Sequence, residues 1–446
     1  MRKKVIIIGA GIAGIASAIE LAQKNIEVIV LERREFPGGR MYSIADNETG
    51  EIIDNGQHIM AGAYVNFFNI LKIIDTFKYI EFQKSLLVPL VNKEGSKSLL
   101  DSSLFPGKAG LFYGFMKFAN VSFKSKLATI KLLRNILNDK IEYNGLTVSD
   151  LLKENQIQDD ITDLFWKPLC LAVMNLNIDD SSALLLANVL KRLFSKKGYS
   201  SLAFSKVPLN DLINPFGVWL KNKGGKLLNK TIVKQLRIEK DKISVILDNN
   251  DELRADAVIS AIPWYSFLKI LPENYHNYLF FETLKEYHNS SIISIYLWLD
   301  KNILETKFTG MIGTLTQWIF NRRNFITDET DKEKYPGHLT LTISGANEII
   351  NVNHEKLVSE CFDEIKSVLK TDAKLLRWKV IKEKFATFKA GPALEEKRLS
   401  QVTPIPNLFI AGDWTATGLP ATLEGAAFSG ILAANYTLNF LNENKI

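Results

Sequence analysis

The strongest constraint on the fold lies near the N-terminus, where an apolar segment runs directly into a glycine-rich turn. Residues 5–8 form a continuous apolar run, which is typical of a strand buried on both faces of a parallel sheet. The turn that follows contains Gly9, Gly11 and Gly14, and residues 15–24 then show a helical pattern. This order of elements predicts an α/β domain of the Rossmann type.

Each residue of the turn has a physical role in binding a dinucleotide. Gly9 permits the tight turn, Gly11 lets the backbone approach a pyrophosphate, and Gly14 allows the helix to pack closely on the strand. Ile12 and Ala13 lie where the N–H groups and the positive dipole end of the helix would face the phosphates. The turn therefore predicts a phosphate-binding cradle.

The second strand, expected at residues 27–31, ends at Glu32, and Arg33 follows. A carboxylate at this position accepts hydrogen bonds from a ribose diol and disfavours a 2′-phosphate. We therefore expect Glu32 and Arg33 to line the nucleotide site and NADP not to be the cofactor.

Two further segments favour FAD over NAD. Gly38, Gly39 and Arg40 follow the second strand, where glycines permit close approach to a cofactor and the arginine could contact its pyrophosphate. Near the C-terminus a short apolar strand ends at Gly412 and Asp413, which is placed to bond ribityl or phosphate groups. A helix then opens at Thr422 and Leu423, and its first turn is expected to face the flavin pyrimidine.

This arrangement resembles the superfamily of FAD-dependent amine oxidases and carotenoid desaturases over nearly the whole chain. Within it, three motifs are similar to those of the hydroxysqualene dehydroxylases, also called squalene-associated FAD-dependent desaturases: Asp54-Asn-Gly-Gln-His-Ile59, Lys167-Pro-Leu-Cys-Leu-Ala172 and Ala411-Gly-Asp-Trp-Thr-Ala-Thr-Gly-Leu-Pro-Ala-Thr422. Lys167 departs from the asparagine expected before Pro-Leu-Cys. The resemblance also implies that Val233 meets the adenine through its backbone.

The implied fold class is α/β, with a discontinuous Rossmann-type FAD-binding domain and a substrate domain built from a mixed sheet and helices. The FAD-binding domain is expected at residues 1–75, 218–265 and 395–446. The substrate domain is expected at 76–217, which has a largely helical pattern, and at 266–394, with strands at 288–299, 311–320, 338–345 and 376–388.

The resemblance implies an activity in which reduced, noncovalently bound FAD converts hydroxysqualene to squalene with loss of water. A general acid must then protonate the departing hydroxyl group, and His58 is the best candidate because histidine needs the smallest pKa shift. A structural role for His58 is equally compatible with the sequence. Asp54 and Glu424 are weaker candidates, since each could simply cap its own segment. Trp264, Trp298, Trp318 and Trp414 could line an apolar tunnel, although core packing suits at least half of them better.

A hydrocarbon substrate of this size favours contact with a membrane. Residues 104–133 interleave phenylalanines with lysines, as an interfacial helix does, although an ordinary core helix would have the same composition. We therefore expect a polyisoprenoid substrate, a membrane surface and an unidentified electron donor as partners, with the protein attached peripherally to the cytoplasmic face of the inner membrane.

Other classes of function are less consistent with the sequence. The net charge of +6 is only mildly basic and no nucleic-acid motif is present, so nucleic acid is not an expected partner. The histidines and cysteines lack metal-ligand spacing, so no metal is expected. Three alternatives remain open: a carotenoid-type desaturase, an amine oxidase, which would usually need a lysine near the flavin, and a non-catalytic lipid carrier that keeps its flavin as a structural element.

Overall fold

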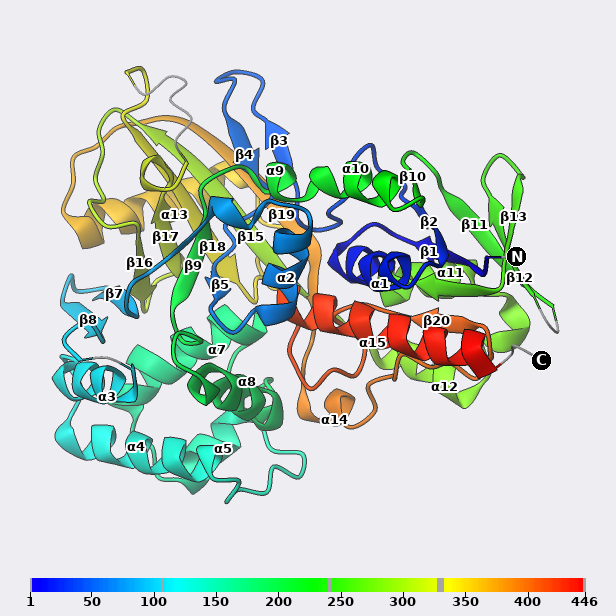
Figure 1. Ribbon diagram of the computed structural model, residues 1–446. Helices are drawn as coiled ribbons and strands as arrows, with labels where there is room; N and C mark the ends of the chain where they lie inside the picture. The colour runs from blue at the N-terminus through cyan, green and yellow to red at the C-terminus, as the bar shows by residue number, and fades with distance from the viewer. Residues whose placement is uncertain (1, 106, 240–241, 327–332, 444–446) are drawn as a thin grey trace.

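The computed structural model describes residues 2–105, 107–239, 242–326 and 333–443. The expected segments at 1–75, 76–217, 218–265, 266–394 and 395–446, and the range 104–133, each include residues outside this part of the chain. Figure 1 shows three regions: a layer that contains β1 (Lys4–Ile8), α1 (Ile12–Gln23) and α15 (Leu423–Glu443), a large sheet that contains β15 (Asn289–Leu299) to β19 (Leu375–Phe388), and a group of helices from α3 (Gly107–Lys117) to α8 (Ala183–Ser195).

The nucleotide-binding region is built on a parallel sheet whose strands come from three distant parts of the chain. Its order is β10 (Lys226–Leu228), β2 (Glu27–Leu31), β1 (Lys4–Ile8), β14 (Ala257–Ser260) and β20 (Leu408–Ile410). The strands are apolar throughout because both faces are buried. Helices α1 (Ile12–Gln23) and α15 (Leu423–Glu443) pack against each other on this sheet (Figure 1).

Helix α1 begins earlier than the expected residue 15, because Gly11 is its N-cap and Ile12 is already helical. A Cβ on Gly14 would lie 1.9 Å from the carbonyl oxygen of Gly9. Only glycine therefore permits the helix to start so close to the end of β1.

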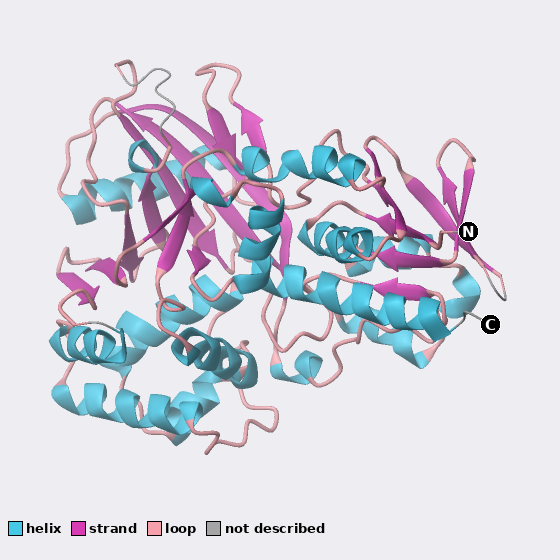
Figure 2. Cartoon of the chain, in the orientation of Figure 1, coloured by secondary structure: helices cyan, strands magenta, loops and turns pink. Residues whose placement is uncertain are grey.

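The second region is a mixed seven-stranded sheet, visible as the largest group of strands in Figure 2. Its order is β19 (Leu375–Phe388), β15 (Asn289–Leu299), β18 (Gly337–Ser344), β17 (Trp318–Asn321), β16 (Phe308–Ile312), β7 (Leu87–Asn92) and β8 (Lys97–Asp101). Ile293, Ile295 and Leu297 pack with apolar residues of α13 (His354–Leu369). Since side chains alternate along a strand, Ser294 and Tyr296 point to the opposite face, toward the rest of the molecule.

One expectation for the substrate region was wrong. Residues 311–320 do not form one strand: β16 and β17 are antiparallel, and Gly313, with φ of +77°, lies in the turn between them. Residues 76–217 are mostly helical, and they also contain the strands β6 (Ile80–Phe82), β7, β8 and β9 (Leu202–Ser205). These strands are short, so a helical period over the whole segment hides them.

Residues 104–133 do not form a single interfacial helix. They contain α3 (Gly107–Lys117) and the first part of α4 (Phe123–Leu137). Phe115 and Phe118 are buried in the core, whereas Phe112 and Phe123 are exposed. In the described part of the chain, no helix is long and apolar enough to cross a membrane.

The hairpin of β3 (Ser43–Ala45) and β4 (Ile52–Asp54) joins the two regions. Buried Arg322 donates to Asp54 and to the carbonyl oxygen of Ile52, and Arg323 forms an ion pair with Glu51 at 2.7 Å. The loop that follows β4 is therefore fixed to the seven-stranded sheet.

Candidate functional site

One cavity of about 1520 Å³ connects the parallel sheet, the seven-stranded sheet and the helices. The residues that the sequence predicted for cofactor binding line it together, with the exception of Gly14: Gly9, Gly11, Ile12, Ala13, Glu32, Arg33, Gly38, Gly39, Arg40, Val233, Gly412, Asp413, Thr422 and Leu423. Gly14 instead packs against the backbone of Gly9. Three separate segments thus meet at one site.

The glycine turn leaves open space where a pyrophosphate would lie. Gly9 has φ of +98°, a conformation that side chains disfavour, and turns the chain from β1 into α1. A Cβ on Gly11 would meet only the Cα of Gly39, at 3.9 Å, so the backbone there is accessible from the cavity. The N-terminus of α1, at Ile12 and Ala13, borders the same space.

Glu32 is held at the cavity wall by two backbone donors. Its carboxylate accepts hydrogen bonds from the N–H groups of Ala10 and Arg34, both at 2.8 Å. These contacts fix its orientation while free lone pairs remain for ribose hydroxyls. Val233 begins β11 (Val233–Ile238), and it lines the same cavity.

Arg40 and Asp413, predicted as separate contacts to the cofactor, are paired with each other in this structure. Nη2 of Arg40 lies 2.6 Å from Oδ2 of Asp413, and Nη1 donates to the carbonyl oxygen of Ala386. The pair joins the loop after β2 to the loop after β20 at the cavity wall. A flavin could be held by either side chain, and together they fix the distance between the two loops.

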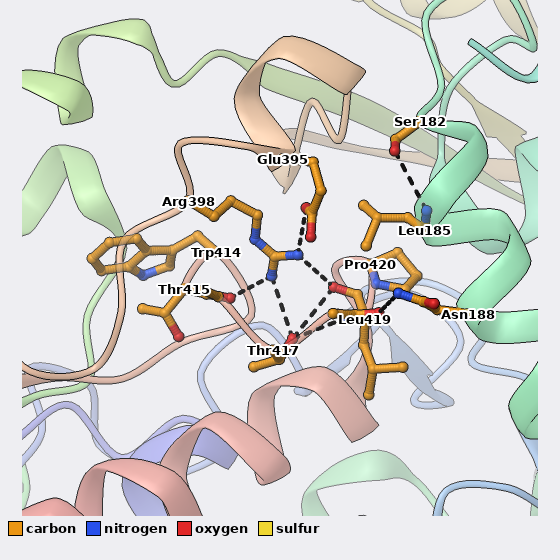
Figure 3. A network of polar contacts seen from close by, with 12 residues as sticks. Ser182, Leu185, Asn188, Glu395, Arg398, Trp414, Thr415, Thr417, Leu419 and Pro420 are labelled. Carbon is orange, nitrogen blue, oxygen red and sulfur yellow. Dashed lines mark hydrogen bonds and ion pairs between the residues drawn. The ribbon is translucent and has the colours of Figure 1, made fainter. Parts of the chain in front are cut away.

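The buried side chain of Arg398 holds the loop after β20 in place (Figure 3). Its guanidinium donates to the carbonyl oxygens of Asp413, Thr415 and Leu419 and pairs with Glu395 at 2.8 Å. Asn188 of α8 (Ala183–Ser195) donates to Gly418 in the same loop. The segment that carries Asp413 and leads to α15 is therefore rigidly positioned.

Glu424, a candidate acid, has a structural set of partners. Its buried carboxylate accepts from the backbone N–H groups of Asn66 and Phe67 and pairs with Arg192. It thereby caps α2 (Val65–Ile73) and connects α2 to α8 and α15. Burial raises the pKa of Glu424, but these donors favour its charged form. The arrangement suits an anchor better than a proton donor.

Asp54 is similarly occupied. It accepts from the hydroxyl of Ser43 at 2.7 Å, from the N–H of Leu209 at 3.1 Å and from Arg322 at 3.2 Å. Asp54 is not among the described residues that line the cavity. Its geometry therefore assigns it to holding the loop that carries His58.

His58 lines the cavity, and Asp54, Glu383 and Arg40 all act on its charge. Burial lowers the pKa of His58 below its ordinary value, Asp54 opposes this, and Arg40 adds to it. The imidazole is therefore mostly neutral at pH 7 and a stronger acid once protonated.

The four tryptophans considered for the apolar tunnel fall into two groups, those that line the cavity and those that do not. Trp318 and Trp414 line the cavity, whereas Trp264 and Trp298 are buried away from it. Trp298 donates to Glu51 at 3.2 Å and stacks on His338. Trp414 is also buried in the core, so three of the four are core residues, and one of these borders the cavity.

Sequence reasoning missed the arginines that hold the site. Arg192, Arg322 and Arg398 lie outside the recognised motifs, and each meets a motif residue only after folding. Glu383 was also missed: it lines the cavity and accepts from the hydroxyl of Tyr42 at 2.8 Å. Single charged residues at helical or strand positions give no local signal of such roles.

Solved structures with a similar fold include an oxidoreductase from Methanosarcina mazei, with a TM-score of 0.75 and 18% identity over 96% of this chain and 99% of that one. A putrescine oxidase structure has a TM-score of 0.73 and 14% identity over 98% of this chain and 99% of that one. These likenesses establish the fold.

Similar curated proteins include a hydroxysqualene dehydroxylase of Rhodopseudomonas palustris, 27% identical over 98% of this chain and 99% of its own length. The 15-cis-phytoene desaturase of Solanum lycopersicum is 26% identical over 97% of this chain and 77% of its own length. The family model described as flavin containing amine oxidoreductase matches residues 12–438. With the glycine cradle and its acid in place, the chain belongs to this family and its cofactor is FAD.

Proposed function

We propose that this oxidoreductase removes the hydroxyl group from a long isoprenoid alcohol, with hydroxysqualene as the substrate that best fits. The observation that carries the proposal is a single cavity that joins the FAD cradle to a long apolar chamber. The whole-length similarity to hydroxysqualene dehydroxylases supports the same assignment.

The apolar chamber lies between the seven-stranded sheet and the helical layer. Its lining includes Leu111, Phe115, Phe118, Ile130, Leu133 and Leu169. A chain of about thirty carbons buried there would be favoured by on the order of 20 kcal/mol, at about 0.8 kcal/mol per carbon. A small amine would leave most of this surface without contacts.

In the net reaction the alcohol gains a hydride and a proton, the C–O bond breaks, and water leaves. The cofactor, when reduced, supplies the hydride; the protein must orient the carbon chain, exclude bulk water and deliver the proton. We assign the proton to His58, since Asp54 and Glu424 are held by other donors. The electron donor that reduces the cofactor is a separate, unidentified partner.

We further propose that the substrate enters from a membrane at the cytoplasmic face. Exposed apolar side chains gather on β8, α3, α4 and the segment between β8 and α3: Leu99, Leu104, Phe105, Phe112, Phe123 and Leu127. Exposed Lys117, Lys124 and Lys131 lie among them in the sequence, and such cations are attracted to anionic lipid. We call these six apolar residues the apolar patch. Phe112 belongs to it and also lines the cavity, so the patch and the chamber are continuous.

The decisive experiment is anaerobic incubation of photoreduced holoenzyme with hydroxysqualene, followed by product analysis. We expect squalene in amounts equal to the flavin present, together with return of the oxidised flavin spectrum. Oxidised holoenzyme serves as the control and should form none. Unchanged hydroxysqualene in both samples would contradict the proposal.

The carotenoid-type desaturase is the second candidate, because phytoene desaturases match the chain about as well. In that reaction the hydrocarbon is oxidised and the oxidised cofactor is reduced. Under argon, phytoene should then bleach the flavin of oxidised holoenzyme, whereas the dehydroxylase assignment predicts no bleaching.

A further inference from the structure

The face of the seven-stranded sheet that lines the cavity has two chemically different halves. We call this face the cavity floor. Strands β7, β8, β16 and β17 contribute apolar side chains to it: Val88, Leu90, Leu100, Phe308, Trp318 and Phe320. Strands β15 and β18 contribute Ser294, Thr342 and Ser344 beside Ile292, and β19, next to β15, contributes Glu383. The floor therefore changes from apolar to hydroxyl-bearing between β17 and β18, which are neighbouring strands.

The polar half of the floor meets the loop that carries His58. Ser294 and Thr342 are directly opposite each other on β15 and β18, so their side chains are neighbours on one face. A Cβ on Gly56 would lie 2.9 Å from Oγ of Ser294, and the hydroxyl of Tyr296 donates to the carbonyl oxygen of Asp54 at 2.6 Å. Asn55, between Asp54 and Gly56, is therefore held against the same part of the floor.

Two polar atoms in this group lack a hydrogen-bond partner. They are Oδ1 of Asn55 and Oγ1 of Thr342, and both residues line the cavity. Buried polar atoms are normally paired, so two unpaired polar atoms on residues that line one cavity are unfavourable unless a ligand completes them. Both atoms are buried, so ligand binding requires rotation of both side chains: Thr342 exchanges its hydroxyl with its methyl group, and Asn55 turns its amide toward the cavity.

From this juxtaposition we infer that Asn55, Ser294 and Thr342 form a subsite that binds the hydroxyl group of the substrate. The inference rests on the proposed function and deepens it, because it identifies the residues that select an alcohol over a hydrocarbon of the same length. An alcohol oxygen can donate to Oδ1 of Asn55 while it accepts from Thr342 or Ser294. The carbon chain then extends over the apolar half of the floor.

The subsite explains why a largely apolar cavity keeps hydroxyl groups at one place. A hydrocarbon that occupies the subsite leaves these polar atoms without partners, and such a penalty rejects analogues more effectively than a missing apolar contact does. It also lies beside the His58 loop, so the oxygen that must leave is held next to the proposed proton donor.

The test compares the binding of hydroxysqualene and squalene to oxidised holoenzyme, followed through the flavin absorbance without turnover. Thr342→Val keeps the shape and removes the hydroxyl, and Asn55→Leu removes the amide at similar volume. We expect each to weaken hydroxysqualene binding by about three- to tenfold, with squalene binding unchanged. Thr316→Val is the matched control, since Thr316 is fully buried and does not line the cavity.

An equal loss of binding for hydroxysqualene and squalene, or no loss for either, would overturn the subsite. So would a lower FAD content or an altered flavin spectrum in ligand-free Thr342→Val, because the hydroxyl would then serve the cofactor. Failure of the proposed function gives a different pattern: wild-type enzyme would not convert hydroxysqualene, while the variants would still lose their preference for the alcohol. Normal conversion with unchanged preference in the variants would instead refute only the subsite.

Discussion

Single side chains hold the loops around the cofactor, and Arg398 is the clearest case. Its guanidinium is fully buried and bonds backbone oxygens of the loop that follows β20. Arg398→Met leaves those oxygens and Glu395 without a cation, so we expect a loss of about 3–5 kcal/mol in the free energy of unfolding and weaker retention of FAD. Thermal denaturation and flavin release on gel filtration measure both. Arg237→Met removes an exposed ion pair and should change neither appreciably.

The side chain of His58 leads to a prediction about how the reaction rate depends on pH. Burial keeps the pKa of His58 below its ordinary value of 6.5, so the protonated fraction grows only as the pH falls toward that lower pKa. The rate of flavin reoxidation by hydroxysqualene should therefore rise as the pH falls below 6.5. His58→Ala should retain FAD, lose this pH dependence and react about 10²–10⁴-fold more slowly. Reduction of an artificial one-electron acceptor is the control. A variant within a few-fold of wild type would leave His58 with a structural role.

The residues of the site differ in how far the sequence could predict them. Gly9, Gly11 and Glu32 belong to one local pattern, and they line the cavity as that pattern predicts. The sequence identified Glu424 as a candidate acid, but its partners lie on α2 and α8. Its function as an anchor therefore depends on tertiary contacts. Ser294 and Thr342 are ordinary strand residues until β15 and β18 pair.

Among the elements, the hairpin of β3 and β4 depends on a buried charged cluster. Nδ1 of His338 lies 2.7 Å from Glu51, which also pairs with Arg323. Burial lowers the pKa of His338 to about 4, whereas an unfolded chain has an ordinary histidine near 6.5. The unfolded state therefore binds the proton first as the pH falls. The stability that His338 contributes is complete above about pH 6.5 and is lost between there and about pH 4.

We expect that loss to be on the order of 3 kcal/mol, since one pKa unit corresponds to about 1.4 kcal/mol. Glu51, whose pKa is lowered to about 2, adds a second loss below its ordinary value of 4.5. In urea denaturation at a series of pH values, His338→Gln should show a shallower decline between pH 6.5 and 4. His354→Gln alters an exposed histidine and should follow the wild-type curve. Identical curves for all three proteins would show that His338 does not titrate on folding.

Elements with a single strong hydrophobic period could be predicted from the sequence. Elements whose bounds or orientation depend on neighbouring segments could not. Strand β2 has the expected bounds because its apolar run ends at a charged residue. The turn at Gly313 was missed because apolar residues flank it on both sides. Composition alone could not show that Phe115 and Phe118 face inward while Phe112 faces outward, because the side of α3 that meets the core is set by Phe165 and other distant residues.

At the scale of the whole molecule, the apolar patch predicts binding to lipid. Replacing Phe105, Phe112 and Phe123 with serine should abolish sedimentation with anionic liposomes while the flavin spectrum and thermal stability remain, because all three side chains are exposed. Substitution at Phe115 or Phe118 would be uninformative, since both are core residues. Val218, Leu279 and Val402 are exposed apolar residues on other elements, and their replacement with serine is the matched control. Equal sedimentation of both triple variants would exclude the patch as the contact surface.

The order of strands in the parallel sheet has a consequence for biosynthesis. β1 lies between strands from the first and middle parts of the chain, and the sheet ends at β20, beside which α15 packs. Asp413 and the start of α15 therefore join the cofactor site only after all five strands of the parallel sheet have been synthesised. A nascent chain that lacks this segment would hold a nucleotide cradle with one wall missing, and its apolar chamber would stay open to water and to chaperones. Stable retention of flavin should thus require the segment that carries Asp413, and FAD would bind after this segment has folded rather than at the start of folding.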